Sequence, residues 1–196
     1  NLERHVDNIR KFGVTPVVAL NRFDTDTPAE LKWVRDWAER TGVAIAEADV
    51  WAKGGEGATE LATTLLDNLT ESTSTQLYDP ANGIEASIET IAREIYRADD
   101  IQYSAAALRD LKMLKDNGFD TLPVCVSKTQ YSFSDDPQQL GAPEGHTLHV
   151  RNLIPRTGAG FVVALTGDVM TMPGLPKKPA ANNIDVDNEG RVSGLF

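Results

Sequence analysis

Amphipathic helical patterns alternate with short apolar runs along this chain, and this alternation constrains its fold more than any other feature. Apolar residues recur at helical spacing over residues 2–12, and a valine-rich run at residues 15–21 predicts a short buried strand. Thr27, followed by Pro28 and Glu30, is typical of a capped helix start, and a second apolar run follows at residues 43–49. The alternation predicts an α/β fold with a mostly parallel sheet and flanking helices.

The same pattern continues along the rest of the chain. A helix is expected over residues 57–69, a polar surface connection at 71–76, and a helical isoleucine stripe from Ile84 to Ile95. Ser104 caps a further expected helix, and strands are expected at residues 122–127, 146–155 and 158–165. The pattern predicts two small α/β subdomains, residues 1–76 and 77–196.

Composition and charge exclude several classes of protein. The hydrophobic fraction of 41% and the charged fraction of 24% are those of an ordinary globular protein. The net charge of −10 argues against a nucleic-acid partner, because phosphate binding needs clustered lysine and arginine. No apolar run is long enough to cross a membrane and the first residues are unlike a signal peptide, so a cytoplasmic location is expected. Cys125 lies in an apolar run and is expected to be a small buried residue.

Two aromatic residues follow the first two predicted strands. Phe23 comes just after one strand and Trp51 just after the next, so neighbouring parallel strands would place both rings at one rim of the sheet. A flat bicyclic ring fits between two such faces. A different interpretation of the same residues is also open, in which Trp51 belongs to the core and Phe23 plugs a loop.

Other polar and glycine-rich segments give weaker signals. Lys128 follows the predicted strand at residues 122–127, so it is expected at the same rim, either bound to an anion or solvated. The glycine-rich turn at residues 52–57 precedes a predicted helix, but the G-x-x-x-x-G-K-[ST] pattern of a P-loop is absent from the sequence. His5, His146 and His149 are expected at the surface or rim and not in a metal site, because the last two fall on opposite faces of a strand.

Four ordered segments resemble the formate–tetrahydrofolate ligase family. They are ALNRFDTDT at residues 19–27, DVWAKGGEG at 49–57, KTQYSFSDDP at 128–137, and the closing run LTGDVMTMPGLPKKPAANNIDVDNEGRVSGLF at 165–196. The closing run holds a glycine- and proline-fixed loop in which Met170 is a candidate rim residue. The resemblance extends over nearly the whole chain and identifies it as the carboxyl-terminal portion of such an enzyme.

The resemblance implies an ATP-dependent ligase that joins formate to tetrahydrofolate and gives 10-formyltetrahydrofolate, ADP and phosphate. Mg-ATP and tetrahydrofolate are then substrates, a monovalent cation is a candidate cofactor, and the intact protein is a homo-oligomer of four subunits. The family's phosphate-binding loop lies in an amino-terminal domain, so this chain is expected to be an inactive fragment of a larger P-loop-type enzyme.

The resemblance also assigns the two aromatic residues. Phe23 and Trp51 match the pair that holds the pterin ring of the folate, with Asp24 and Lys128 as further candidate rim residues. Asp24 departs from the family pattern, which often has an apolar residue at that position, and leaves the orientation and affinity of the ring open. The alternative to this assignment is a non-catalytic α/β scaffold or assembly module without a ligand of its own.

Overall fold

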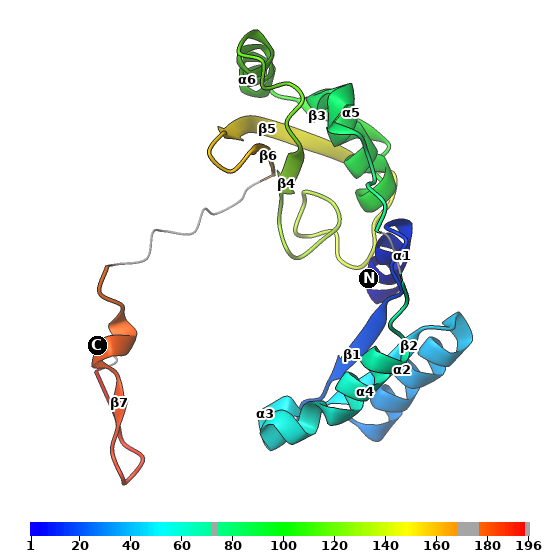
Figure 1. Ribbon diagram of the computed structural model, residues 1–196, viewed down its shortest axis with the longest axis vertical. Coiled ribbons are helices and arrows are strands. Elements are labelled where there is room, and N and C mark those ends of the chain that lie inside the picture. The colour runs from blue at the N-terminus through cyan, green and yellow to red at the C-terminus, as the bar shows by residue number, and fades with distance from the viewer. Residues whose placement is uncertain (72–73, 168–176, 195–196) are drawn as a thin grey trace.

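The computed structural model describes residues 1–71, 74–167 and 177–194. Its elements form two groups that are joined through residues 68–79, and a short carboxyl-terminal hairpin stands apart from both groups (Figure 1). The hairpin consists of β7 (Asp185–Val186) and β8 (Val192–Ser193), preceded by the 3-10 turn η4 (Ala180–Asn183).

The first group is a two-stranded parallel sheet with helices around it. Its elements are α1 (Leu2–Lys11), β1 (Val17–Asn21), α2 (Pro28–Thr41), β2 (Ala44–Ala48), α3 (Val50–Lys53), η1 (Gly54–Ala58) and α4 (Thr59–Asp67). The helix expected over residues 57–69 is α4, and the short helix α3 and the 3-10 turn η1 precede it.

Local sequence chemistry accounts for the ends of α2. The Thr27 hydroxyl accepts a hydrogen bond from the Glu30 amide, while the Glu30 carboxylate accepts one from the Thr27 amide at 2.9 Å. Gly42 ends the helix at φ 63°, a conformation that costs glycine little. The predicted capping box is therefore confirmed, and it fixes where α2 begins.

The second group is built on a four-stranded sheet of order β3-β5-β6-β4. Helices α5 and α6 pack on it, and Ile88, Leu111 and Leu114 lie in the core that they share with Val150 and Val162 of the sheet. The elements are η2 (Pro80–Asn82), α5 (Ile84–Thr90), the π-helix η3 (Ile91–Tyr96), β3 (Asp100–Tyr103), α6 (Ala105–Asp116), β4 (Val124–Ser127), β5 (Thr147–Arg156) and β6 (Phe161–Thr166).

The α/β class is confirmed, and the second sheet is mixed, with one antiparallel pair among parallel ones. The pairs β3–β5 and β4–β6 are parallel, whereas β5 and β6 are antiparallel. A four-residue turn, residues 157–160, joins β5 to β6, and Gly160 adopts φ 77° there while its amide binds the Arg156 carbonyl at 2.8 Å. So short a connection permits only an antiparallel pair, because a parallel pair needs a long crossover.

Side-chain alternation along β4 corrects the expectation for Cys125. The residue was expected to be buried in an apolar run, but its side chain is exposed. Val124 and Val126 pack at the core, so Cys125 between them faces the other side of the sheet.

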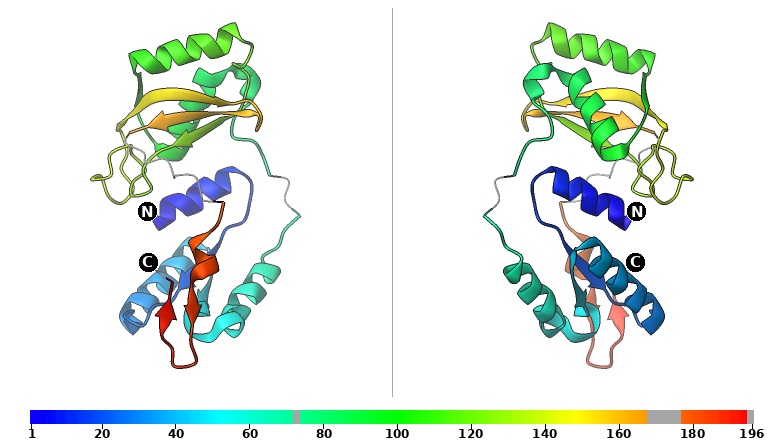
Figure 2. Two further views of the ribbon diagram at one scale, coloured as in Figure 1. Left: turned by 90° about the vertical axis from the view of Figure 1, so that its left-hand side faces the viewer. Right: turned by 90° about the vertical axis from the view of Figure 1, so that its right-hand side faces the viewer.

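Helix α1 contacts both groups. Val6 packs with Trp37 and Val43 of the first group, while Arg4 donates a hydrogen bond to Glu144 at 2.6 Å and Asn8 donates one to the Ile95 carbonyl. The views in Figure 2 place α1 between the two groups. The division into residues 1–76 and 77–196 stays a prediction.

A membrane-crossing segment is not found in the part of the chain that the structure describes, where every helix is too short or too polar to span a bilayer.

Candidate functional site

The carboxyl ends of β1 and β2 form the edge at which Phe23 and Trp51 lie. The strands pair in parallel register from Val17 opposite Ala44 to Asn21 opposite Ala48. The pairing continues one residue further, because the Arg22 amide donates to the Ala48 carbonyl at 3.0 Å. Phe23 follows directly on β1, and Trp51 lies in α3, which directly follows β2 at this end of the strand (Figure 1).

Both aromatic side chains are available to a ligand. Phe23 is 61% exposed and Trp51 is 83% exposed, so neither residue contributes to the core of the first group. Within this chain, the structure does not bury Trp51 in a core or Phe23 as a plug. Two large apolar side chains in the open at one sheet edge offer surface that a flat apolar ligand would cover.

A tight turn holds the backbone of Phe23. The Phe23 amide donates to the Asp26 carboxylate at 2.8 Å, and the Asp26 amide donates to the Phe23 carbonyl at 3.0 Å. Thr27, the next residue, begins α2, so the turn is fixed at both ends. Asp26 thus works as a turn residue that positions Phe23, and Asp24 is left exposed at the tip of the turn.

A close backbone approach holds the segment that carries Trp51. The Asp49 amide donates to the Gly57 carbonyl at 3.0 Å, and a Cβ on Gly57 would lie only 2.2 Å from the Asp49 carbonyl oxygen. Only glycine fits at this position without a shift of the backbone. The glycine-rich turn at residues 52–57 therefore ties the start of α3 to the start of α4, and it sets the position of Trp51.

Charged side chains near this edge are paired with one another. Lys53 lies 2.9 Å from the Asp49 carboxylate, and Glu47 forms ion pairs with both Arg22 and Arg35. The carboxylates of Asp24 and Asp26 lie in the adjacent turn, so the cations at this edge are offset by acids and leave no local excess of positive charge.

The structure does not bring Lys128 to this edge. Lys128 follows β4, which belongs to the four-stranded sheet, so the expectation of one shared rim is wrong. Its ammonium group donates to the Thr129 carbonyl at 2.8 Å and to the Ser132 carbonyl, and it lies 5.2 Å from the centre of the Tyr96 ring. Burial lowers the pKa of Lys128, since desolvation disfavours its charged form. Lys128 therefore stabilises the loop that follows β4 through hydrogen bonds to its carbonyl groups. Met170, the other candidate rim residue, lies outside the described residues.

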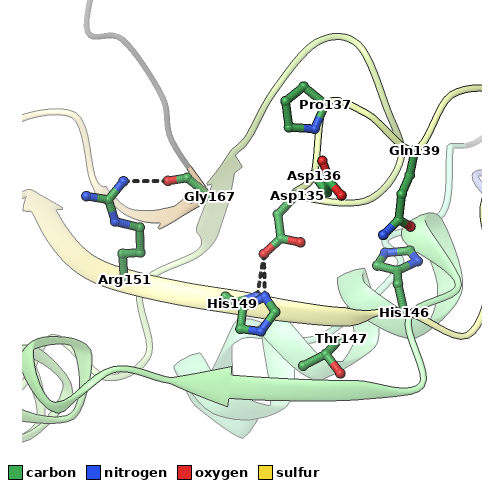
Figure 3. A pocket seen from close by; sticks show the side chains of 9 residues that line it. All are labelled: Asp135, Asp136, Pro137, Gln139, His146, Thr147, His149, Arg151 and Gly167. Carbon is green, nitrogen blue, oxygen red and sulfur yellow. Dashed lines mark hydrogen bonds and ion pairs between the residues drawn. The ribbon is translucent and has the colours of Figure 1, made fainter.

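A second polar cleft, of about 640 Å³, lies beside the second sheet (Figure 3). Its residues come from the loop after β4, from the start of β5 and from the end of β6. They are Asp135, Asp136, Pro137, Gln139, His146, Thr147, His149, Arg151 and Gly167.

Asp135 organises this cleft. Its carboxylate accepts hydrogen bonds from the His149 amide at 2.8 Å and from the His149 ring at 2.9 Å. Gly167 permits the approach of this loop, because a Cβ there would lie 2.5 Å from the Asp135 carbonyl oxygen. A hydrogen bond within the loop also stabilises it, between the Ser132 and Ser134 hydroxyls, which lie 3.1 Å apart.

The two histidines of this cleft lie on the same side, against the expectation of opposite faces. His146 precedes β5, so the alternation of side chains along a strand does not extend to it. Burial lowers the pKa of His146, and the nearby Asp135 carboxylate acts in the opposite direction. Among the described residues, no group of three or more His, Cys, Asp or Glu side chains is arranged to hold a metal ion.

The chain is similar to known proteins along its whole length. A family model described as formate–tetrahydrofolate ligase matches residues 1–196. Proteins of that description are 64% identical over 203 residues in Corynebacterium jeikeium (strain K411) and 63% identical over 196 residues in Corynebacterium diphtheriae (strain ATCC 700971). Another, from Arthrobacter sp. (strain FB24), is 54% identical over 199 residues. All of this chain is covered in each comparison, but the chain spans only 35–36% of the length of these relatives.

Proposed function

Because this chain belongs to the formate–tetrahydrofolate ligase family, we propose that it is the part of such a ligase that binds the pterin ring of tetrahydrofolate, between Phe23 and Trp51. The observation that carries the proposal is the parallel register of β1 and β2. It sets two exposed aromatic side chains at the carboxyl ends of neighbouring strands, the edge at which open α/β sheets usually bind ligands.

The role proposed for this chain is to position the substrate. A pterin between two aromatic faces gains apolar burial and about 0.5–1.5 kcal/mol for each favourable ring contact. The Asp26 turn and the Asp49–Gly57 contact fix the backbone on either side of that slot. Such orientation of a nucleophile toward an activated formyl group can lower a barrier by about 7–11 kcal/mol, and it requires no acid or base from this chain.

The phosphates of ATP are proposed to bind in the rest of the polypeptide. The sequence has no P-loop, and the described residues hold no cluster suited to a divalent cation. We therefore propose that the ligase loses activity when reduced to this chain. The substrates proposed for the intact ligase are Mg-ATP, formate and tetrahydrofolate. It is also proposed to act as a homo-oligomer in the cytoplasm.

Tryptophan fluorescence tests folate binding directly. The chain has three tryptophans, of which Trp37 is buried and Trp33 and Trp51 are exposed. Added tetrahydrofolate should quench the emission of the wild-type chain and of the Trp33→Phe variant, and it should leave the Trp51→Phe variant unchanged. Equal quenching in the two variants would contradict the assignment. A wild-type chain that shows no saturable quenching would instead favour the scaffold without a ligand.

A further inference from the structure

Strand β1 has a free edge. Within the described residues its one partner is β2, on one side only. The Arg22 amide bonds to β2, and backbone groups alternate between the two sides of a strand, so the amides of Val17, Ala19 and Asn21 point away from β2. Parallel sheets in proteins are covered and rarely have so few strands, so an open edge of this kind calls for a partner.

The surface beside this edge is apolar and uncovered. Ala19 is exposed, although its register partner Ala46 on β2 is only 2% exposed. Helix α4 packs mainly against β2 and less against β1, and Leu65 and Leu66 near its end and Leu69 just beyond it are 50%, 67% and 65% exposed. The apolar run of β1 is the composition of an interior strand and not of a solvent-facing edge.

The helices show on which side the missing strand belongs. Val6 of α1 and Trp37 of α2 share one apolar cluster with Val18 and Ile45, which are register partners, so both helices cover the same face of the sheet. Helix α2 is the crossover from β1 to β2. Crossovers between parallel strands are right-handed, so a strand that leads into α1 lies on the opposite side of β1 from β2.

We propose that an extended segment of the longer ligase polypeptide, from the part that precedes α1, binds the free edge of β1 as a parallel strand. The chain spans about a third of the length of its relatives, so a polypeptide long enough to supply this strand exists. With that strand in place, β1 is an interior strand. Phe23 then lies at the middle of a three-stranded edge and not at the margin of a two-stranded one.

Residue-resolved hydrogen exchange in the intact ligase tests this pairing. The amides of Ala19 and Asn21 should exchange about 100-fold or more slowly than unprotected amides, as Leu20 and Arg22 do because they bond to β2. Alternating fast exchange at Ala19 and Asn21, with slow exchange at Leu20 and Arg22, would overturn the proposal. Protection that appears only as the protein self-associates would assign the edge to a second copy and would also overturn it.

A matched pair of variants provides an independent test in the intact ligase. Ala19→Glu places a carboxylate where the added strand and its cover would exclude water, whereas Ala29→Glu adds the same group on the exposed first turn of α2. Ala19→Glu should shift the urea midpoint downward and restore fast exchange at Asn21, while Ala29→Glu should do neither. Equal midpoints and equal exchange in the two variants would show that Ala19 stays in solvent, which contradicts the proposal.

Discussion

The contact between Gly57 and Asp49 gives the sharpest test of how Trp51 is positioned. A Cβ at Gly57 would lie 2.2 Å from the Asp49 carbonyl oxygen and 2.5 Å from its carbonyl carbon, both backbone atoms. The two segments must therefore separate by about 0.8 Å or more in a Gly57→Ala variant to reach the closest distance that a real Cβ tolerates, about 3.0 Å. Trp51 lies two residues from Asp49 and must move with it.

The magnitude follows from two opposing effects. Replacing glycine by alanine where the backbone permits it stabilises a protein by about 0.4–1 kcal/mol through the unfolded chain, whereas overpacking costs about 1–3 kcal/mol. Gly57→Ala should therefore lower the free energy of unfolding, while Gly55→Ala, with open space around its Cβ and no positive φ, should leave it unchanged or raise it. A displacement of Trp51 by about 1 Å should also weaken folate binding. It should lower the turnover number by up to about 100-fold.

Urea denaturation and tetrahydrofolate kinetics of both variants in the intact ligase measure these effects. If Gly57→Ala is as stable as Gly55→Ala and keeps the wild-type Michaelis constant, then Gly57 does not fix the position of Trp51, and the reasoning fails.

Three further outcomes are expected. Asp26→Ala should raise the Michaelis constant for tetrahydrofolate with little change for ATP, because it removes the acceptor of the Phe23 amide; equal changes for both substrates would count against it. The pKa of His146 is held below its usual 6.5, so the unfolded chain binds the proton more readily, and stability present above about pH 6.5 should fall as the pH drops below it. His146→Gln should reduce the change of the urea midpoint between pH 7 and 5.5, and the same change in the variant as in the wild type would refute this. The chain by itself should show no submicromolar Mg-ATP binding by calorimetry, and such binding would overturn the placement of the phosphate site.

The parts of the fold that rest on local chemistry could be predicted from the sequence. The Thr27 capping box and the Ser104 cap, whose hydroxyl accepts from the Ala107 amide at 3.0 Å, depend only on residues within one helical turn. The two first strands and their shared edge could be predicted as well, because a single helix joins them and the crossover makes them parallel neighbours.

The parts that depend on strand order and on which face of a sheet is covered could not be predicted. Cys125 looks buried in its apolar run, and it is exposed because Val124 and Val126 face the core and Cys125 faces the other side of the sheet. Lys128 follows a strand as Phe23 does, but that strand belongs to a different sheet. The cleft around Asp135 joins residues 135–151 to Gly167, just past the far end of β6, and the need of Gly167 for a close approach becomes visible only in three dimensions.

The central claim is that Trp51 contacts the pterin ring, and steady-state kinetics of the intact ligase test it most directly. Trp51→Ala should raise the Michaelis constant for tetrahydrofolate about 10-fold or more, from lost ring contact and apolar burial, and should leave that for ATP unchanged. Trp33→Ala removes another exposed tryptophan, 65% exposed on α2, and should change neither constant. Equal increases for tetrahydrofolate and ATP, or the same response in both variants, would contradict the account.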